Sequence, residues 1–268
     1  RECNDILHVL GCFDDDIIIH VEGNVKRVRD KEIIDTELQL KDLESVERKL
    51  QRVEKMARVG SDTKAKAEFE ILQRCQNHLM AGKSIHSLGL SKEDKAAVAD
   101  LFLLTDKPVL YVANVDEASM HTGNAFSEQL KKAVEAEGAQ VIVMCNNIEA
   151  QIAEMDNTED KQMFMEEYKM TEPALNRLIQ SAYKLLNLDT YFTAGVQEVR
   201  AWTIHKGWKA PQAASVIHTD FEKGFIKAEV IAYEDFVKYG SEAACRDNGR
   251  LRIEGKEYLV KDGDIMHF

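Results

Sequence analysis

The sequence has no apolar segment long enough to cross a membrane. Its 268 residues are 44% hydrophobic and 31% charged, and no run approaches the roughly 18 apolar residues that a spanning helix needs. The first five residues, Arg-Glu-Cys-Asn-Asp, are polar, unlike those of a secretory signal peptide. We therefore expect a soluble globular protein of about two domains that does not bind membranes.

The cysteines lack the close spacing of metal-binding motifs. There are five, an odd number, and they are scattered along the chain: Cys3, Cys12, Cys75, Cys145 and Cys245. This scatter favours reduced thiols over a disulfide framework, and so a cytoplasmic location. The cysteines suggest no metal site.

A phosphate-binding loop is also missing, although one stretch imitates its end. Gly82-Lys83-Ser84 matches the last three positions of G-x-x-x-x-G-K-[ST], but Asn77 stands where the first glycine must be. The preceding residues have helical apolar spacing, whereas a P-loop follows a buried strand. Gly82 is therefore predicted to end a helix, with Lys83 near the negative end of the helix dipole.

Charge is distributed unevenly over a net −12. Residues 188–268 contain 11 Lys and Arg against 13 Asp and Glu, a net of −2. The preceding part contains 24 against 34, a net of −10. Because an acidic body repels phosphate backbones, this distribution disfavours broad non-specific nucleic-acid binding but leaves the near-neutral tail able to touch RNA locally.

Two paired helices are predicted in the first third of the chain. Apolar residues recur in alternating steps of three and four, first at Leu43, Val46, Leu50, Val53 and Ala57, then at Ala65, Phe69, Leu72, Gln76 and Leu79. Residues 59–62 break the pattern, and Ser61 or Asp62 is predicted to cap the second helix. The pattern indicates an antiparallel hairpin. It leaves open whether the hairpin only packs or binds a partner. A third helix, capped by Ser91, is predicted over residues 91–104.

Strands and helices alternate in the middle of the chain. Residues 6–13 read as a core strand, residues 14–24 as strand or loop, and residues 107–117 (KPVLYVANVDE) as a strand buried on both faces. The helix predicted over 125–138 and the strand over 139–147 complete a βαβ unit. Further helices are predicted at 148–155, 159–168 and 172–186. Since the chain enters a core strand almost at once and has no initial methionine, we expect residues before Arg1.

The pattern of apolar and turn-forming residues changes at about residue 188. Alternating and turn-rich segments predict a small, β-rich α+β module. Residues 249–268 (GRLRIEGKEYLVKDGDIMHF) have the pattern of a hairpin. The sequence has no internal repeat and no low-complexity tract.

The loop after the buried strand, Asn114-Val115-Asp116-Glu117, has the pattern of a nucleotide-base site. Ligands of open α/β sheets bind where strands end, and GTPases place Asn-Lys-x-Asp there to read guanine. Here Val115 replaces lysine, and Glu117 is one methylene longer than aspartate. The aspartate of GTPases accepts hydrogen bonds from the ring N–H and the amino group of guanine. Adenine has no ring N–H at that edge, so the guanine-binding arrangement would not bind it. The tetrapeptide is a weak signal, and Asn114 could equally cap its own turn.

The whole chain resembles the Obg-like ATPases of the YchF type. The resemblance rests on KPVLYVANVDE, on VIVMCNNIEAQIAEM and above all on TDFEKGFIKAEV at 219–230. It implies an α/β fold in which residues 1–20 and 105–187 belong to a P-loop NTPase (Rossmann-like) domain and the helices that follow it. A helical coiled-coil hairpin would be inserted at 21–104, and residues 188–268 would form a ubiquitin-like β-grasp TGS domain.

The resemblance also implies a function. Family members bind and hydrolyse ATP with Mg²⁺ and act with the ribosome, through its large subunit or ribosomal RNA; a monomer is expected. Asn114, Val115 and Glu117 correspond to the adenine-recognition loop. Cys145-Asn146-Asn147 corresponds to a second base-side loop, where GTPases carry Ser-Ala-Lys, and its two asparagines depart from the small residues of relatives.

The resemblance places the P-loop, both switch regions and the Mg²⁺ ligands before Arg1. Phosphoryl transfer needs that cradle and its metal, so this polypeptide is expected not to hydrolyse ATP on its own, and ATP or ADP with Mg²⁺ is expected as the ligand of the full-length protein. The alternative is a non-catalytic module that binds ribosome or RNA through hairpin and tail.

One cluster in the tail invites two interpretations. His218 lies near Asp220 and Glu222 in sequence, as an acid/base or metal group would. A surface patch that binds a partner, including His218, Lys223 and Lys227, suits a TGS domain better. Two further cations, Arg250 and Arg252, could extend it into a basic face.

Overall fold

The computed structural model describes residues 2–13, 27–58, 63–195 and 198–268. They form two compact units, one up to Ala182 and the other from Tyr183 onward. The segment 14–24 and the predicted cap at Ser61 or Asp62 lie outside the described residues. No described helix is long and apolar enough to span a membrane.

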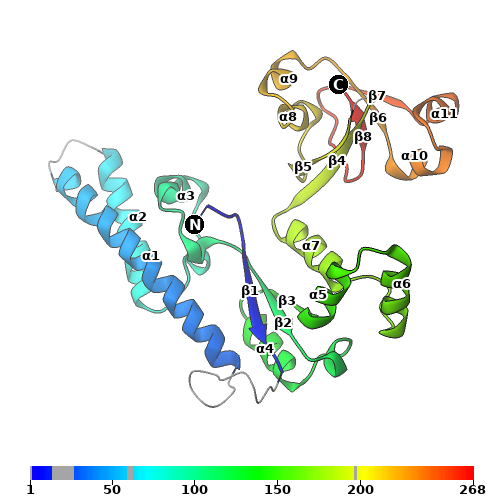
Figure 1. The fold of residues 1–268 in the computed structure, drawn as a ribbon. Helices are drawn as coiled ribbons and strands as arrows, with labels where there is room; N and C mark the ends of the chain where they lie inside the picture. Colours follow the sequence, from blue (N-terminus) through cyan, green and yellow to red (C-terminus); the bar gives the residue numbers. More distant parts are fainter. Residues whose placement is uncertain (1, 14–26, 59–62, 196–197) are drawn as a thin grey trace. The chain divides into compact units, whose positions relative to one another are not determined.

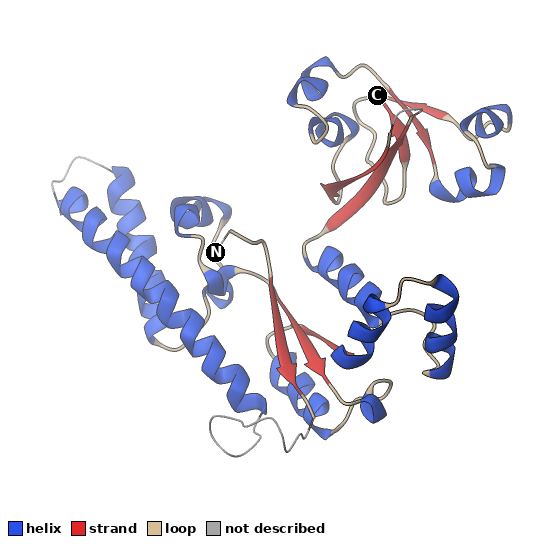
Figure 2. Ribbon diagram, viewed as in Figure 1, coloured by secondary structure: helices blue, strands red, loops and turns tan. Residues whose placement is uncertain are grey.

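The first unit contains a three-stranded parallel sheet with β2 in the middle (Figures 1 and 2). Its strands are β1 (Ile6–Gly11), β2 (Val109–Asn114) and β3 (Gln140–Met144). Helix α4 (Ala125–Glu135) connects β2 to β3, which confirms the predicted βαβ unit. Four successive residues of β2 are buried, as expected of a strand covered on both faces.

Each face of this sheet has its own core. On one face Tyr111 and Ala113 belong to the cluster that includes the buried side chains of α4. On the other face Val112 packs with α7 (Ala174–Leu185). Between β3 and α7 the chain forms α5 (Asn146–Glu154) and α6 (Thr158–Glu167). The strand predicted to reach residue 147 ends at Met144, and α5 begins two residues earlier than the predicted 148. Asn146 and Asn147 are therefore the start of a helix and not the end of a strand.

The predicted helical hairpin is present. Helices α1 (Arg27–Arg58) and α2 (Thr63–Met80) lie side by side and antiparallel (Figure 1). The predicted stripes are buried or packed on the hairpin core, with one exception. Cys75 is buried, whereas Gln76 is only half-buried and donates a hydrogen bond to Glu47. At this point the buried stripe of α2 therefore lies one residue before the predicted position.

The Gly82-Lys83-Ser84 stretch, which imitates the end of a P-loop, follows the end of α2, as predicted. Gly82 has φ of +69°, a conformation that glycine adopts without strain. Its N–H donates to the carbonyl of Leu79, and the N–H of Lys83 donates to the carbonyl of His78. These two bonds form a Schellman cap.

The third helix is shorter than predicted. Ser91 caps α3 (Lys92–Val98), as expected, but the helix does not reach residue 104. Three short 3₁₀ helices flank it, η1 (Ile85–Leu88), η2 (Ala99–Leu101) and η3 (Leu104–Asp106). The buried Asp42 carboxylate accepts the N–H groups of residues 104 and 105. This long-range contact, which sequence periodicity does not report, holds the segment in place of a continued helix.

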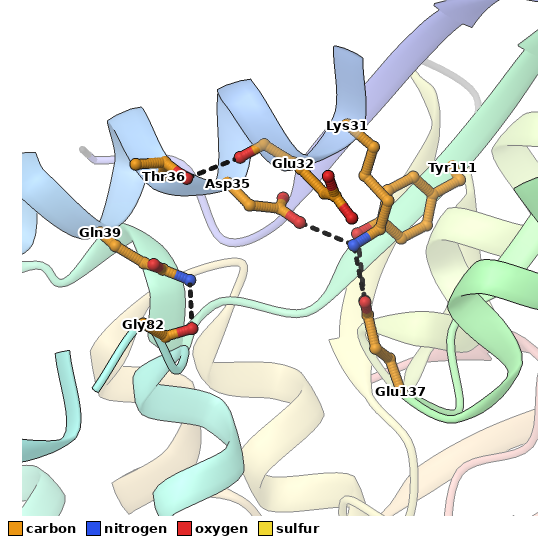
Figure 3. A network of polar contacts seen from close by, with 8 residues as sticks. All are labelled: Lys31, Glu32, Asp35, Thr36, Gln39, Gly82, Tyr111 and Glu137. Carbon is orange, nitrogen blue, oxygen red and sulfur yellow. Dashed lines mark hydrogen bonds and ion pairs between the residues drawn. The ribbon is translucent and has the colours of Figure 1, made fainter. Parts of the chain in front are cut away.

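A buried lysine joins the base of the hairpin to the sheet (Figure 3). The Lys31 side chain of α1 is 6% exposed, and its ammonium lies 2.6 Å from both Asp35 and Glu137. It also lies over the ring of Tyr111, whose hydroxyl donates to Glu137. The neighbouring ring of His8 stacks beside Tyr111. One cation thus connects α1, β2 and the loop after α4.

Burial and hydrogen bonding together determine the pKa values of this cluster. It lowers the pKa of Lys31, but hydrogen bonds with Asp35 and Glu137 outweigh it and raise that pKa above its ordinary value. Burial also lowers the pKa of His8 and raises that of the Tyr111 hydroxyl. At neutral pH Lys31 is therefore charged.

The second unit is built on a five-stranded mixed sheet in the order β5-β4-β8-β6-β7. Its strands are β4 (Leu188–Ala194), β5 (Val199–His205), β6 (Ala228–Ile231), β7 (Arg252–Glu254) and β8 (Ile265–His267). The hairpin predicted over 249–268 is wrong. Strands β7 and β8 each pair with β6, which lies between them; two adjacent strands in sequence need not pair when a third supplies a better partner.

Four short helices complete this unit. They are α8 (Ala210–Ser215), α9 (Thr219–Gly224), α10 (Tyr233–Tyr239) and α11 (Glu242–Asp247). The core contains small alanines of α8 packed with larger side chains of the sheet, among them Tyr191 and Met266. The predicted β-rich α+β module is confirmed.

We predict that Lys31→Met destabilises the first unit by about 2 kcal/mol. Breaking a buried pair costs roughly 3–5 kcal/mol, and Glu137, which is 45% exposed, can recover part of this through water. Urea unfolding followed by helical circular dichroism measures the loss. Lys55→Met, at an exposed position of the same helix, should change stability by less than about 0.5 kcal/mol. Equal effects of the two substitutions would contradict the anchoring role of Lys31.

Candidate functional site

Two chain segments meet at the carboxyl edge of the parallel sheet. Asn114 is the last residue of β2, and α5 begins at Asn146, two residues after β3 ends. Adjacent parallel strands finish at the same edge, where open α/β sheets bind their ligands. The sequence predicted both segments as base-recognition loops.

Three hydrogen bonds join these segments. The Asn114 side-chain oxygen accepts the N–H of Asn146 at 2.9 Å. The N–H of Val115 donates to the carbonyl of Met144 at 2.9 Å. The side-chain amide of Asn147 donates to Oε1 of Glu117 at 3.0 Å. The two segments are therefore held as one surface rather than as two independent loops.

The hypothesis that Asn114 caps its own turn is wrong. The residue that caps the turn is Asp116, whose carboxylate accepts the N–H of Ser119 at 2.8 Å at the start of η4 (Glu117–Ser119). Asn114 instead bonds across to α5. Its oxygen is used in that bond, and the structure gives its Nδ2 no partner among the described residues.

Burial separates the predicted site residues into two groups. Glu117, Asn146 and Asn147 are exposed, and Asn114 is partly exposed. Val115 and Cys145 are 2% and 4% exposed, and both side chains belong to the core beneath the site. Only the main chain of these two residues can face a ligand, and the Val115 N–H is already bonded.

Residues that the sequence analysis missed support this edge from the side of α7. The Glu149 carboxylate accepts the N–H groups of Ala174 at 2.8 Å and Leu175 at 3.1 Å, and so caps α7. The His121 ring lies 2.8 Å from the carbonyl of Tyr168. A pocket of about 170 Å³ lies here, with Cys145 in its wall. No sequence signal marks Glu149, because its partners are 25 and 26 positions away.

The described residues do not fit a metal ion. No group of three or more His, Cys, Asp or Glu in them could hold one. The Gly82-Lys83-Ser84 stretch that imitates a phosphate loop ends a helix.

The structure gives His218 a local role. Its Nδ1 accepts the N–H of Asp220 at 3.2 Å and caps α9, and the Asp220 carboxylate is 3.6 Å away. The predicted partner residues Lys223 and Lys227 are both exposed. The ammonium of Lys227 lies 3.5 Å from Glu229.

The predicted basic face is not purely basic. Arg250 lies 3.7 Å from Asp235, and Arg252 lies 3.5 Å from Glu254. Hydrogen bonding to Tyr258 and the nearby acids outweigh burial and raise the pKa of Arg252. Three of the four cations face acids, so Lys223 is the one to which the described residues give no ion pair.

Comparison with known proteins gives consistent relatives. The family model YchF-GTPase_C, described as a protein of unknown function (DUF933), matches residues 188–268. The chain is 50% identical over 268 residues to the ribosome-binding ATPase YchF of Escherichia coli O157:H7, covering 100% of this chain and 73% of that protein. It is 47% identical over 270 residues to the Bacillus subtilis (strain 168) protein of the same name, with the same coverage.

Relatives at lower identity also match nearly the whole chain. Obg-like ATPase 1 of Xenopus laevis is 44% identical over 271 residues, covering 99% of this chain and 68% of that protein. The solved structure of the Schizosaccharomyces pombe YchF GTPase superposes with a TM-score of 0.82 at 37% identity, covering 98% of this chain and 71% of that one. The names of these relatives include both ATPase and GTPase, so the names alone do not decide which base is bound.

We predict that Asn114→Ala destabilises the first unit by about 1 kcal/mol, the usual net value of one hydrogen bond. Asn114→Asp retains the acceptor for the Asn146 N–H and should cost only a few tenths, because a carboxylate is favourable at a helix N-terminus. Urea unfolding and amide exchange at Asn146 report both effects. Asn176→Ala, at an exposed position of α7, is the control. Equal stability of the Ala and Asp variants at position 114 would show that the bond contributes nothing.

Proposed function

The chain belongs to the family of YchF-type and Obg-like ATPases, and from this premise we propose that it binds ATP, selects adenine through Asn114 and Glu117, and associates with the ribosome. The observation that carries the first two statements is the set of hydrogen bonds that holds these two side chains on α5. The names of the relatives support the third.

The hydrogen-bonding capacity of the site favours adenine. Because the Asn114 oxygen is bonded to α5, its Nδ2 remains as a donor, while Glu117 offers an acceptor. Adenine presents the N7 acceptor beside the N6 amino donor, whereas guanine presents two acceptors, N7 and O6. A donor and an acceptor side by side match the adenine edge. Against guanine the carboxylate would face a carbonyl oxygen, which is repulsive.

These residues provide the base-binding half of a nucleotide site. ATP or ADP would be held at its base by the carboxyl edge, and Mg²⁺ would come with the phosphates. The described residues supply no phosphate cradle, so hydrolysis is proposed only because relatives of the chain are named ATPases.

The domain organisation supports the same proposal. Strands β1 and β2 are parallel neighbours, yet residues 12–108 run between them and include the hairpin. We assign residues 1–20 and 105–187 to a nucleotide-binding domain with its following helices, and 21–104 to an inserted coiled-coil hairpin. Residues 188–268 are assigned to a TGS domain of the β-grasp type, acting in a monomer.

Ribosome association in the cytoplasm is assigned to the hairpin and the TGS domain together, through ribosomal RNA or the large subunit. The exposed Lys223 and Lys227, with His218, are the proposed contacts of the tail. The alternative function, a non-catalytic ribosome- or RNA-binding module, uses the same surfaces without a nucleotide. Weak charge on the tail beside an acidic body favours RNA as the partner of the tail.

The contact between Glu117 and the adenine amino group can be tested with an analogue that lacks this group. In a polypeptide that also carries a phosphate-binding loop, replacing ATP by purine riboside triphosphate should weaken binding about tenfold, the effect of roughly 1.4 kcal/mol. In Glu117→Ala the two nucleotides should bind equally, because the partner of the amino group is gone. Competition binding measures the four affinities.

Glu154→Ala, at an exposed acid near the end of α5, should behave as the unmodified protein does. A tenfold preference for ATP that persists in Glu117→Ala would assign the amino group to another residue. Absence of nucleotide binding together with intact ribosome binding would favour the non-catalytic module.

Ribosome association should weaken with salt and need the tail. Reversing the charge of Lys223 and Lys227 to glutamate should reduce co-sedimentation several-fold at low ionic strength and less at high, because screened surface charges act mainly at low salt. Deleting residues 188–268 should reduce it further. Lys256→Glu, at another exposed lysine of the tail, is the control. Undiminished pelleting of the chain without 188–268 would leave the hairpin as the binding surface.

A further inference from the structure

One exposed side chain of the second segment contacts the group that reads the base. Asn147, in the first turn of α5, donates its side-chain amide to Oε1 of Glu117 at 3.0 Å. Both side chains are exposed, so this bond does not fill a core. The structure gives the other carboxylate oxygen, Oε2, no partner among the described residues.

We propose that Asn147 determines nucleotide specificity by occupying one oxygen of Glu117 and leaving the other for a ligand with a single donor. This inference rests on the proposed adenine recognition by Glu117. Asn147 acts through Glu117 and is a positioning residue.

The chemistry of the two purines makes this occupancy selective. Guanine bound in the orientation of adenine would place its O6 against the carboxylate. It can bind a carboxylate favourably only after turning to present its ring N1–H and amino group, two parallel donors that need both oxygens, as a guanidinium does. Adenine offers one amino group. In Glu117 one carboxylate oxygen is already bonded, and this bond holds the plane of the carboxylate in place. Such a carboxylate can accept the one amino group of adenine fully but the two donors of guanine only in part.

The position of Asn147 is itself fixed. The residue before it, Asn146, gives its N–H to the Asn114 oxygen, so the first turn of α5 is tied to the end of β2. Two consecutive residues of α5 therefore hold the two side chains assigned to the base. The first uses its main-chain N–H, which only a proline would remove, and the second uses its side chain, which other substitutions can test.

The contact is examined first without nucleotide, in the 268-residue chain. The Asn147 side-chain amide resonances should move in Glu117→Ala, because their hydrogen-bond acceptor is gone. Gln151→Ala, which removes a side-chain amide one turn further along α5, should leave the Asn147 resonances unchanged. An Asn147 amide that does not respond to Glu117 would overturn the proposal.

The selectivity is then measured as the ratio of ATP to GTP affinity, in a polypeptide that also carries a phosphate-binding loop. Asn147→Ala should lower this ratio about fivefold to tenfold, mainly by improving GTP binding, since the loss of one hydrogen bond partner changes affinity by about this amount. Asn147→Gln retains the donor and should recover most of the ratio. Asn147→Asp places a second carboxylate beside Glu117 and should weaken ATP binding itself.

The outcomes separate this inference from the proposed function. If Glu117→Ala leaves the ratio unchanged, base recognition by Glu117 is wrong and the inference fails with it. If Glu117→Ala lowers the ratio but Asn147→Ala matches Gln151→Ala, recognition by Glu117 stands and the role of Asn147 is refuted. A lowered ratio in Asn147→Ala that Asn147→Gln restores supports the proposal.

Discussion

The parallel pairing of β2 between β1 and β3 is the constraint on which the first unit depends. A central parallel strand has neighbours on both edges and must be covered on both faces, because its side chains alternate between them. Helices α4 and α7 cover the two faces. Because the strands are parallel, the chain has to return after each strand to the edge of the sheet where the next strand begins. The carboxyl ends of β2 and β3 therefore meet, and the site follows from the topology before any polar side chain is considered.

Local patterns predicted the elements but not the contacts between them. The apolar run of β2 and the stripes of α1 and α2 are periodic, and burial follows periodicity. The bond from Asn114 to Asn146 spans 32 positions, and no local pattern encodes it. The same reason explains two of the errors. Asp42 holds residue 104, at the start of η3, from 62 positions away, and β6, which comes earlier in the chain, lies between β7 and β8.

The hairpin raises a different physical question, because a long insertion between two adjacent strands must not disturb their pairing. Lys31 provides a fixed attachment at its base. A buried cation is expensive unless it is paired, and here two carboxylates and the face of Tyr111 surround it. An apolar contact would hold the helix as firmly but would accept several orientations, whereas a lysine between two acids accepts few. Directional bonds of this kind hold α1 in one orientation relative to the sheet.

The proposed site would separate two properties that nucleotide sites usually combine. Phosphate contacts and a metal hold a nucleotide without distinguishing its base, whereas the base recognition that we propose for the carboxyl edge needs only a few polar groups. Here those groups are held by α5 through bonds that exist without a ligand, so their geometry is set in advance and little ordering is left for binding to impose. In the role that we propose for Asn147, preorganisation would let one hydrogen bond affect selectivity at an exposed surface. A mobile carboxylate could turn to satisfy either purine, whereas a carboxylate that is already bonded on one side is a poorer acceptor for a second donor.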